Sequence, residues 1–142
     1  MHYDNEVTII MESKSQNEGF ARLAVSAFVA PMDPTVAELV DIKTAVSEAV
    51  TNAVIHGYES KEGKIHLICR VLGDEVTIEV KDFGRGIEDI DQAKTPLFTS
   101  KPEMERTGMG FTVMESFMDT VEVSSQKDMG TTITMTKKIA RS

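Results

Sequence analysis

The feature that most limits what this chain can fold into is a two-sided helical pattern between residues 33 and 57. Apolar residues recur along it at helical spacing, at Leu39, Val46, Ala49, Val50, Ala53 and Val54. Glu48 and Asn52 lie four residues apart, so their side chains leave the helix about one turn apart on nearly the same face. A carboxylate and a carboxamide held rigidly in this way suit a metal ion and a hydroxyl group. Taken alone, the pair also fits an ordinary solvated helix face, so other motifs must decide.

The bulk properties narrow the classes of protein that fit. With 142 residues, of which 41% are hydrophobic, the chain is expected to form one domain, residues 1–142, around a single core. Fifteen basic against 23 acidic side chains give a net charge of -8 with no dense basic run, which argues against direct nucleic-acid binding. No leader or apolar run of membrane-spanning length is present, so we expect a soluble, cytoplasmic protein without membrane contact. The single cysteine, Cys69, lies in an alternating apolar run and is predicted to be a buried structural thiol.

The first part of the chain predicts a strand and two helices. Residues 7–11 alternate as in a strand, and Ser15 with Glu18 resembles a capping box that opens a helix ending at Pro31. The stripe expected to be buried on this helix consists of Phe20, Leu23, Ala24, Ala27 and Phe28. Asp33 and Pro34 predict the N-cap and first position of the second helix, which ends near Gly57.

The second part predicts an antiparallel hairpin, a helix and two more strands. Apolar residues alternate over 65–71 and 76–80 around a tight turn at residues 73–74, so the hairpin ends at Asp82. Residues 90–107 lack periodicity and fit a mobile loop. Residues 110–118 then read as a helix with a glycine-rich entrance, and two strands follow around a turn at 128–130.

Asp82 begins a second candidate motif, Asp-Phe-Gly-Arg-Gly-Ile. A carboxylate at a strand end followed by Gly84 and Gly86 lets the backbone bend away, so that the side chain faces a flat ligand and accepts a hydrogen bond from an exocyclic amine such as that of adenine. An ordinary Asp-x-Gly turn is the alternative. The triplet is not the metal-binding triplet of eukaryotic-type protein kinases, because no Walker loop, strand lysine or His-Arg-Asp loop accompanies it.

Two further glycine motifs follow. Gly108 and Gly110 precede a predicted helix, where free backbone N–H groups and the helix dipole favour phosphate oxygens. Lys101 and Arg106, just before them, are placed to neutralise terminal phosphate charge, although a solvated charged loop explains them equally. The last motif, Gly130-Thr131, also fits a plain hairpin turn.

Together the four motifs resemble the boxes of the GHKL ATPases and kinases, the superfamily of gyrase, the heat-shock chaperone, histidine kinases and mismatch-repair ATPases. Within it, residues 47–58, 96–103 and 105–111 are similar to the anti-sigma serine kinases of spore-forming bacteria. The resemblance covers essentially the whole chain. It implies an α+β fold (an α/β sandwich) of the GHKL or Bergerat type, with a mixed, mainly antiparallel sheet and helices on one face.

The resemblance also implies roles for individual residues, with ATP or ADP and Mg as cofactors. Asn52 would ligate Mg, Glu48 would be the general base, and Asp82 would read adenine with support from Thr131. Arg106 would act with Mg on the charge of the γ-phosphoryl group. The other expected nucleotide contacts are Gly84, Gly86, Lys101, Thr107, Gly108 and Gly110.

The resemblance also implies that the loop between Ala93 and Thr107 acts as a lid. Phe83 departs from the pattern, since a polar or acidic residue is expected between the aspartate and the glycine of the adenine box.

The partners implied by the resemblance are a sporulation sigma factor of the sigma F type, which the protein would inhibit, and an anti-anti-sigma antagonist phosphorylated on serine. A homodimer is also implied. Arg22, on the first helix within a stretch that matches the family, is our candidate partner contact, because arginine is favoured at interface hot spots. Three alternatives remain: a general-stress anti-sigma kinase, an ATP-dependent binding module without kinase activity, and a detached histidine-kinase catalytic domain. The histidine-kinase alternative is disfavoured, because this sequence shows no dimerising helix hairpin with an acceptor histidine.

Overall fold

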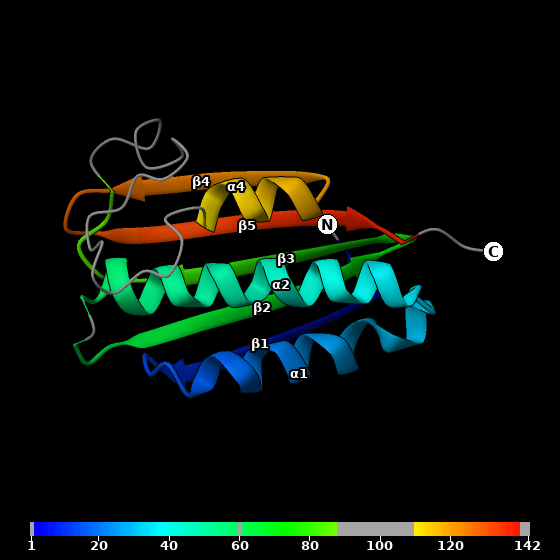
Figure 1. The fold of residues 1–142 in the computed structure, drawn as a ribbon, viewed down its shortest axis with the longest axis horizontal. Helices are drawn as coiled ribbons and strands as arrows, with labels where there is room; N and C mark the ends of the chain where they lie inside the picture. Colours follow the sequence, from blue (N-terminus) through cyan, green and yellow to red (C-terminus); the bar gives the residue numbers. More distant parts are fainter. Residues whose placement is uncertain (1, 60, 88–109, 140–142) are drawn as a thin grey trace.

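The computed structural model describes residues 2–59, 61–87 and 110–139. The described elements, in chain order, are β1 (Asn5–Glu12), α1 (Asn17–Val29), the short 3-10 helix η1 (Ala30–Met32), α2 (Val36–Asn52), the π-helical turn η2 (Ala53–Gly57), β2 (Lys64–Leu72), β3 (Glu75–Asp82), α4 (Gly110–Phe117), β4 (Thr120–Gln126) and β5 (Gly130–Lys138). Figure 1 shows α1, α2 and α4 packed over one face of the sheet.

The sheet has five strands in the order β1-β2-β3-β5-β4. Every neighbouring pair in this described sheet is antiparallel, so the mixed component expected from the sequence is absent from it. The predicted hairpin of residues 64–82 is confirmed, as are the two last strands around residues 128–130. Their period-two alternation places one apolar face toward the helices.

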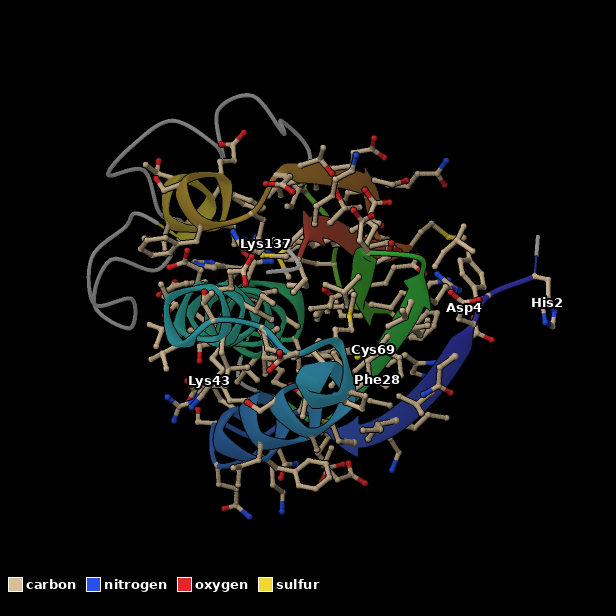
Figure 2. The ribbon with its side chains drawn as sticks, turned by 90° about the vertical axis from the view of Figure 1, so that its right-hand side faces the viewer. His2, Asp4, Phe28, Lys43, Cys69 and Lys137 are labelled. Carbon is tan, nitrogen blue, oxygen red and sulfur yellow. The ribbon has the colours of Figure 1, made fainter. Side chains whose placement is uncertain are left out.

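The core lies between the sheet and the helix layer, as the view from the end of the molecule shows (Figure 2). Cys69 and Phe28 lie between the two layers in this view. The cysteine is 1% exposed, which confirms the predicted buried thiol. The largest fully buried side chains include Ile42, Ile65, Leu67, Ile78, Met114, Ile133 and Met135.

Helix α1 forms as predicted, but its buried face is only partly the expected one: Ala24 and Phe28 are partly buried, and Phe28 packs against the core. Ala21, Val25 and Val29 are the buried residues, whereas Phe20 is 52% and Leu23 68% exposed. Both sets recur at helical spacing, and the fully buried set is the one with the smaller side chains. The expected capping box is also wrong, because Gln16 is the N-cap and no side-chain cap bond forms there.

The start of α2 differs from the expected one by two residues. Thr35 is the N-cap, and its hydroxyl accepts a hydrogen bond from the Glu38 N–H at 3.0 Å. The Glu38 carboxylate in turn accepts one from the Thr35 N–H at 2.8 Å, which completes a capping box. Asp33, predicted to be the cap, instead ends η1 with φ 56°. The predicted end of the helix near Gly57 is confirmed, with η2 as its last turn.

Candidate functional site

The described members of the predicted site lie at one end of the sheet, at the left in Figure 1. Asn52 ends α2, Asp82 ends β3, Thr131 lies at the start of β5 and Gly110 begins α4. Helices α2 and α4 run in opposite directions, so the end of one lies beside the start of the other (Figure 1). The fold thus brings together motifs that are up to about 80 positions apart in the sequence.

Asp82 is the most buried acidic side chain of this group, with 4% of its surface exposed. Its Oδ1 accepts a hydrogen bond from the Gly84 N–H at 2.9 Å, and the Thr131 N–H also donates to its carboxylate. Burial raises the pKa of Asp82 above its ordinary value, although these two backbone donors offset part of the shift. No ion pair to Asp82 is present among the described residues. A buried carboxylate held only by neutral N–H donors fits a further neutral donor such as an amine.

The glycines around Asp82 are explained by close packing of the backbone. A Cβ on Gly57 would lie 2.7 Å from the Asp82 carboxylate, and a Cβ on Gly130 would lie 2.1 Å from the Asp82 carbonyl oxygen. Gly86 has φ +76°, and a Cβ at this position would lie 2.1 Å from the Gln126 carbonyl oxygen. These positions therefore require glycine whether or not a ligand is bound.

Thr131 is 3% exposed and pairs with Asp82 in the register of β3 and β5. Its hydroxyl lies 2.9 Å from that of Ser125 on β4. The Ser125 hydroxyl also accepts a hydrogen bond from the Ile87 N–H at 2.7 Å, so it connects β4 to the loop after Gly86. Ser125 was not predicted as a site residue. The sequence does contain a signal for it, because Ser125 is a polar residue at a position where the alternation of Val121 and Val123 predicts an apolar one.

Phe83 does not face the Asp82 side of the sheet. Because side chains alternate along a strand, the residue after Asp82 points to the opposite face. There its ring meets the His66 ring edge to face, with 5.1 Å between centroids and 74° between planes. The departure from the family pattern therefore leaves the surroundings of the Asp82 carboxylate unchanged.

Glu48 and Asn52 lie on α2 one turn apart and are both partly buried. Ser47, beside Glu48, is buried, and its hydroxyl has no hydrogen-bond partner within the described part of the chain.

Asn52 is followed directly by the π-turn η2, a rare geometry that is frequent at functional sites. No group of three metal-ligating side chains occurs among the described residues. Asn52 alone still fits Mg, since this ion is usually held by one or two protein ligands together with phosphates and waters.

The remaining predicted residues are divided between described and undescribed parts of the chain. Gly110 begins α4, whose Phe111 and Met114 are buried. Lys101, Arg106, Thr107, Gly108 and the expected lid between Ala93 and Thr107 lie outside the described residues. Arg22 is exposed on α1, where its Nε lies 3.6 Å from Glu18 Oε1.

None of the helices in the described ranges combines the length and apolar character needed to cross a bilayer. On the outer face of the sheet, Arg70 forms ion pairs with both Glu6 and Glu79.

Comparisons with known proteins agree with this geometry. The family described as Histidine kinase-like ATPase domain matches residues 12–137. Among curated proteins, the chain is 60% identical to an anti-sigma F factor of Clostridium perfringens, over 96% of this chain and 98% of that protein. It is 58% identical to one from Clostridium kluyveri, over 95% of each chain, and 56% identical to one from Clostridium beijerinckii, again over 95% of each.

Solved structures support the fold alone, since their sequences are distant. The RsbU and RsbW domains of Rv1364c from Mycobacterium tuberculosis match with a TM-score of 0.70 and 21% identity, over 97% of this chain and 33% of that one. The catalytic domain of histidine kinase ThkA matches with a TM-score of 0.59 and 16% identity, over 92% of this chain and 96% of that one. The chain therefore belongs to the histidine kinase-like ATPase domain family and, within it, to the anti-sigma F factors.

Proposed function

We propose that this protein is an ATP-dependent anti-sigma factor that also acts as a serine kinase. In this proposal it binds and inhibits a sporulation sigma factor of the sigma F type in the cytoplasm, and it phosphorylates a serine of an anti-anti-sigma antagonist. Residues 1–142 act as a single nucleotide-binding kinase domain that works as a homodimer. The observation that carries the proposal is 60% identity to an anti-sigma F factor over nearly the whole of both chains.

The adenine end of the site rests on Asp82. Its buried carboxylate keeps acceptor capacity beyond the two backbone donors that it already has, which matches an exocyclic amine. Thr131 stabilises this end through its hydroxyl contact with Ser125 and its backbone donor to Asp82. Gly84 and Gly86 allow the loop backbone to approach closely.

The phosphate end rests on Glu48, Asn52 and the start of α4. Asn52 would hold the Mg of bound Mg-ATP, and the metal would neutralise part of the charge on the γ-phosphoryl group. Glu48 would accept the proton of the acceptor serine hydroxyl as general base, while the γ-phosphoryl group passes to the serine oxygen and ADP leaves. Gly108 and Gly110 offer backbone N–H groups to phosphate oxygens, with Thr107 beside them. Lys101 and Arg106 supply positive charge at the γ-phosphate.

The kinase activity is tested by transfer of labelled γ-phosphate from Mg-ATP to a purified antagonist. Its Ser→Ala variant serves as the negative control, and capture of the sigma factor is scored in the same mixture. We expect labelling of the wild-type antagonist only, with sigma-factor capture that requires ATP. Nucleotide binding without labelling would instead favour a binding module without kinase activity.

The two roles on α2 are separated by substitution. Glu48→Gln should retain nucleotide binding and lose transfer by at least about a hundredfold, because a general base contributes on that order. Asn52→Ala should lose the Mg-dependent part of nucleotide binding. Glu122→Gln, on the exposed face of β4, is the matched control and should behave as wild type. Equal transfer by Glu48→Gln and Glu122→Gln would refute the role of Glu48 as base.

The proposed partner surface lies on α1. Arg22 is exposed on this helix, and Phe20 and Leu23 on the same helix are large apolar side chains that the fold also leaves exposed. Arginine is favoured at interface hot spots, where the loss of a side chain costs at least about fivefold in affinity. Arg22→Ala should therefore bind the sigma factor and the antagonist more weakly, while Lys138→Ala, on the exposed end of β5, should not. Unchanged binding by Arg22→Ala would remove this residue from the interface.

A further inference from the structure

The hydroxyl of Tyr58 lies between the ends of two neighbouring strands. It accepts a hydrogen bond from the Phe83 N–H at 2.7 Å and donates one to the Lys64 carbonyl oxygen at 2.6 Å. In the register of β2 and β3 the last pair is Ile65 with Asp82, so Lys64 and Phe83 would form the next one. The phenol thus bridges the two backbone groups at the point where direct strand pairing stops.

This bridge completes the pairing of the backbone that follows Asp82. The Gly84 N–H donates to Asp82 Oδ1 at 2.9 Å, and the Arg85 N–H donates to the Gly57 carbonyl oxygen at 2.9 Å. With Phe83 held by Tyr58, three successive N–H groups each have a defined acceptor. These bonds hold the loop whose Gly84 N–H contacts the Asp82 carboxylate.

The ring of Tyr58 is itself held in place. Its backbone N–H donates to the Ala53 carbonyl oxygen at 3.0 Å, which fixes the residue at the end of η2. A Cβ on Gly63 would come within 2.4 Å of the ring, so the glycine leaves the space that the ring occupies. The Arg85 Nε donates to the His56 carbonyl oxygen at 2.9 Å, which joins η2 to the same loop a second time.

We propose that Tyr58 is a positioning residue that sets the preference of this site for adenine over hypoxanthine. The inference rests on the proposed nucleotide function and on the proposed role of Asp82 as the acceptor for the exocyclic amine. Without the hydroxyl, the Phe83 N–H and the Lys64 carbonyl lose their shared partner, and the loop that begins at Phe83 is held less firmly. The Gly84 N–H, which donates to Asp82 Oδ1, moves with that loop, so the carboxylate is held less firmly in the position in which it distinguishes an amine from a carbonyl group.

The test compares binding of ATP and inosine triphosphate to the full chain by calorimetry, for wild type and Tyr58→Phe. Inosine carries a carbonyl group in place of the amine, so the ratio of the two affinities reports on Asp82. We expect this ratio to fall by about threefold to tenfold in Tyr58→Phe, since one hydrogen bond of ordinary net strength corresponds to roughly fivefold. Tyr3→Phe is the matched control, because Tyr3, the other tyrosine, lies against Arg70 with 5.3 Å between the guanidinium carbon and the ring centre. Its ratio should equal that of wild type.

A second measurement follows hydrogen exchange at the Phe83 N–H without nucleotide. Slow exchange in wild type and in Tyr3→Phe, with faster exchange in Tyr58→Phe, is expected. Rapid exchange in wild type would overturn the inference without any need for a variant.

The outcomes separate the inference from the function on which it rests. A wild-type protein that binds both nucleotides equally would refute the role of Asp82 in reading adenine. A wild type that prefers ATP, together with a Tyr58→Phe variant that keeps the full preference, would refute only the positioning role of Tyr58.

Discussion

The carbonyl oxygen of Gly57 occupies the space that a side chain at residue 84 would need. A Cβ built on Gly84 would lie 1.9 Å from that oxygen, far inside van der Waals contact. The last turn of the helix that carries Asn52 and the loop that follows Asp82 therefore touch backbone to backbone. This contact, together with the bond from the Arg85 N–H to the same oxygen, ties two motifs of the site into one unit.

Replacing Gly84 should be costly because neither backbone segment can move away easily. We expect Gly84→Ala to lower the free energy of unfolding by about 1–3 kcal/mol, as in other overpacked sites. Gly19→Ala is the matched control, since Gly19 lies inside α1 and the nearest atom to the added Cβ, an Arg22 side-chain nitrogen, would be 4.0 Å away. That change should raise the free energy of unfolding by about 0.5–1 kcal/mol, because alanine is the better helix former. Urea unfolding of both variants checks this, and equal effects would contradict the packing argument.

The stability contributed by Asp82 should decrease as the pH rises. Burial raises its pKa above the ordinary value of 3.8, so the folded protein keeps this proton at a pH where the unfolded protein has lost it. Between the two pKa values the folded state binds more protons, and the free energy of unfolding falls with pH. Asp82→Asn does not titrate and keeps an oxygen for the Gly84 N–H. The difference in unfolding free energy, wild type minus variant, should fall as pH rises through that window and then level off. A difference that rises over the same range, in urea unfolding at a series of pH values, would contradict burial as the dominant cause.

Lys137 should stabilise the end of α4. Its side chain is 13% exposed, and its Nζ donates to the Phe117 carbonyl oxygen at 2.7 Å and lies 3.8 Å from Asp41 Oδ2 on α2. In Figure 2 it lies beside the helix layer, next to α2 and α4. A cation at a helix C-terminus satisfies carbonyl groups that have no partner within the helix. We expect Lys137→Met to lower the free energy of unfolding by about 1–3 kcal/mol, since the bond to a charged donor is lost.

The neighbouring Lys138 provides the control for that measurement. Its side chain lies on the exposed end of β5, so Lys138→Met should change the free energy of unfolding by less than about 0.5 kcal/mol. Chemical unfolding of the two variants, side by side, distinguishes a loss of the specific contact from a general loss of positive charge.

Cys69 should be inert in the folded protein. Burial raises the pKa of its thiol to about 12, and the thiolate is the form that reacts with thiol reagents. Modification by a chromogenic disulfide reagent in native buffer should therefore be slow, and the reactive fraction should follow the unfolding curve as urea is added. Rapid, complete modification of the native protein would show that the thiol is accessible.

The strands were predictable because alternation is a local signal. The hairpin of residues 64–82 shows an apolar residue at nearly every second position, and the last two strands show the same alternation over Val121 and Val123 and over Ile133 and Met135. A strand buried on one face favours that pattern. Helix α1 was predicted, but its fully buried residues were not. It has two apolar stripes at helical spacing, and only packing against α2 and the sheet selects Ala21, Val25 and Val29.

The error at the start of α2 was of a different kind. Asp33 and Thr35 are both good N-cap residues, but Thr35 alone has a glutamate three positions later to complete a capping box. That signal is local and was present in the sequence. The left-handed conformation of Asp33, by contrast, depends on the way η1 ends.

By itself the sequence determined the order of the elements, their inward-facing positions in the strands and the residue types of the four motifs, because these follow from spacing along the chain. Tertiary structure alone decided that the Gly57 carbonyl meets Gly84, that Ser125 contacts Thr131 and that the Tyr58 hydroxyl lies between two strand ends. Such contacts join segments far apart in the sequence. They depend on strand order and register, which emerge only when the sheet and the helix layer pack together.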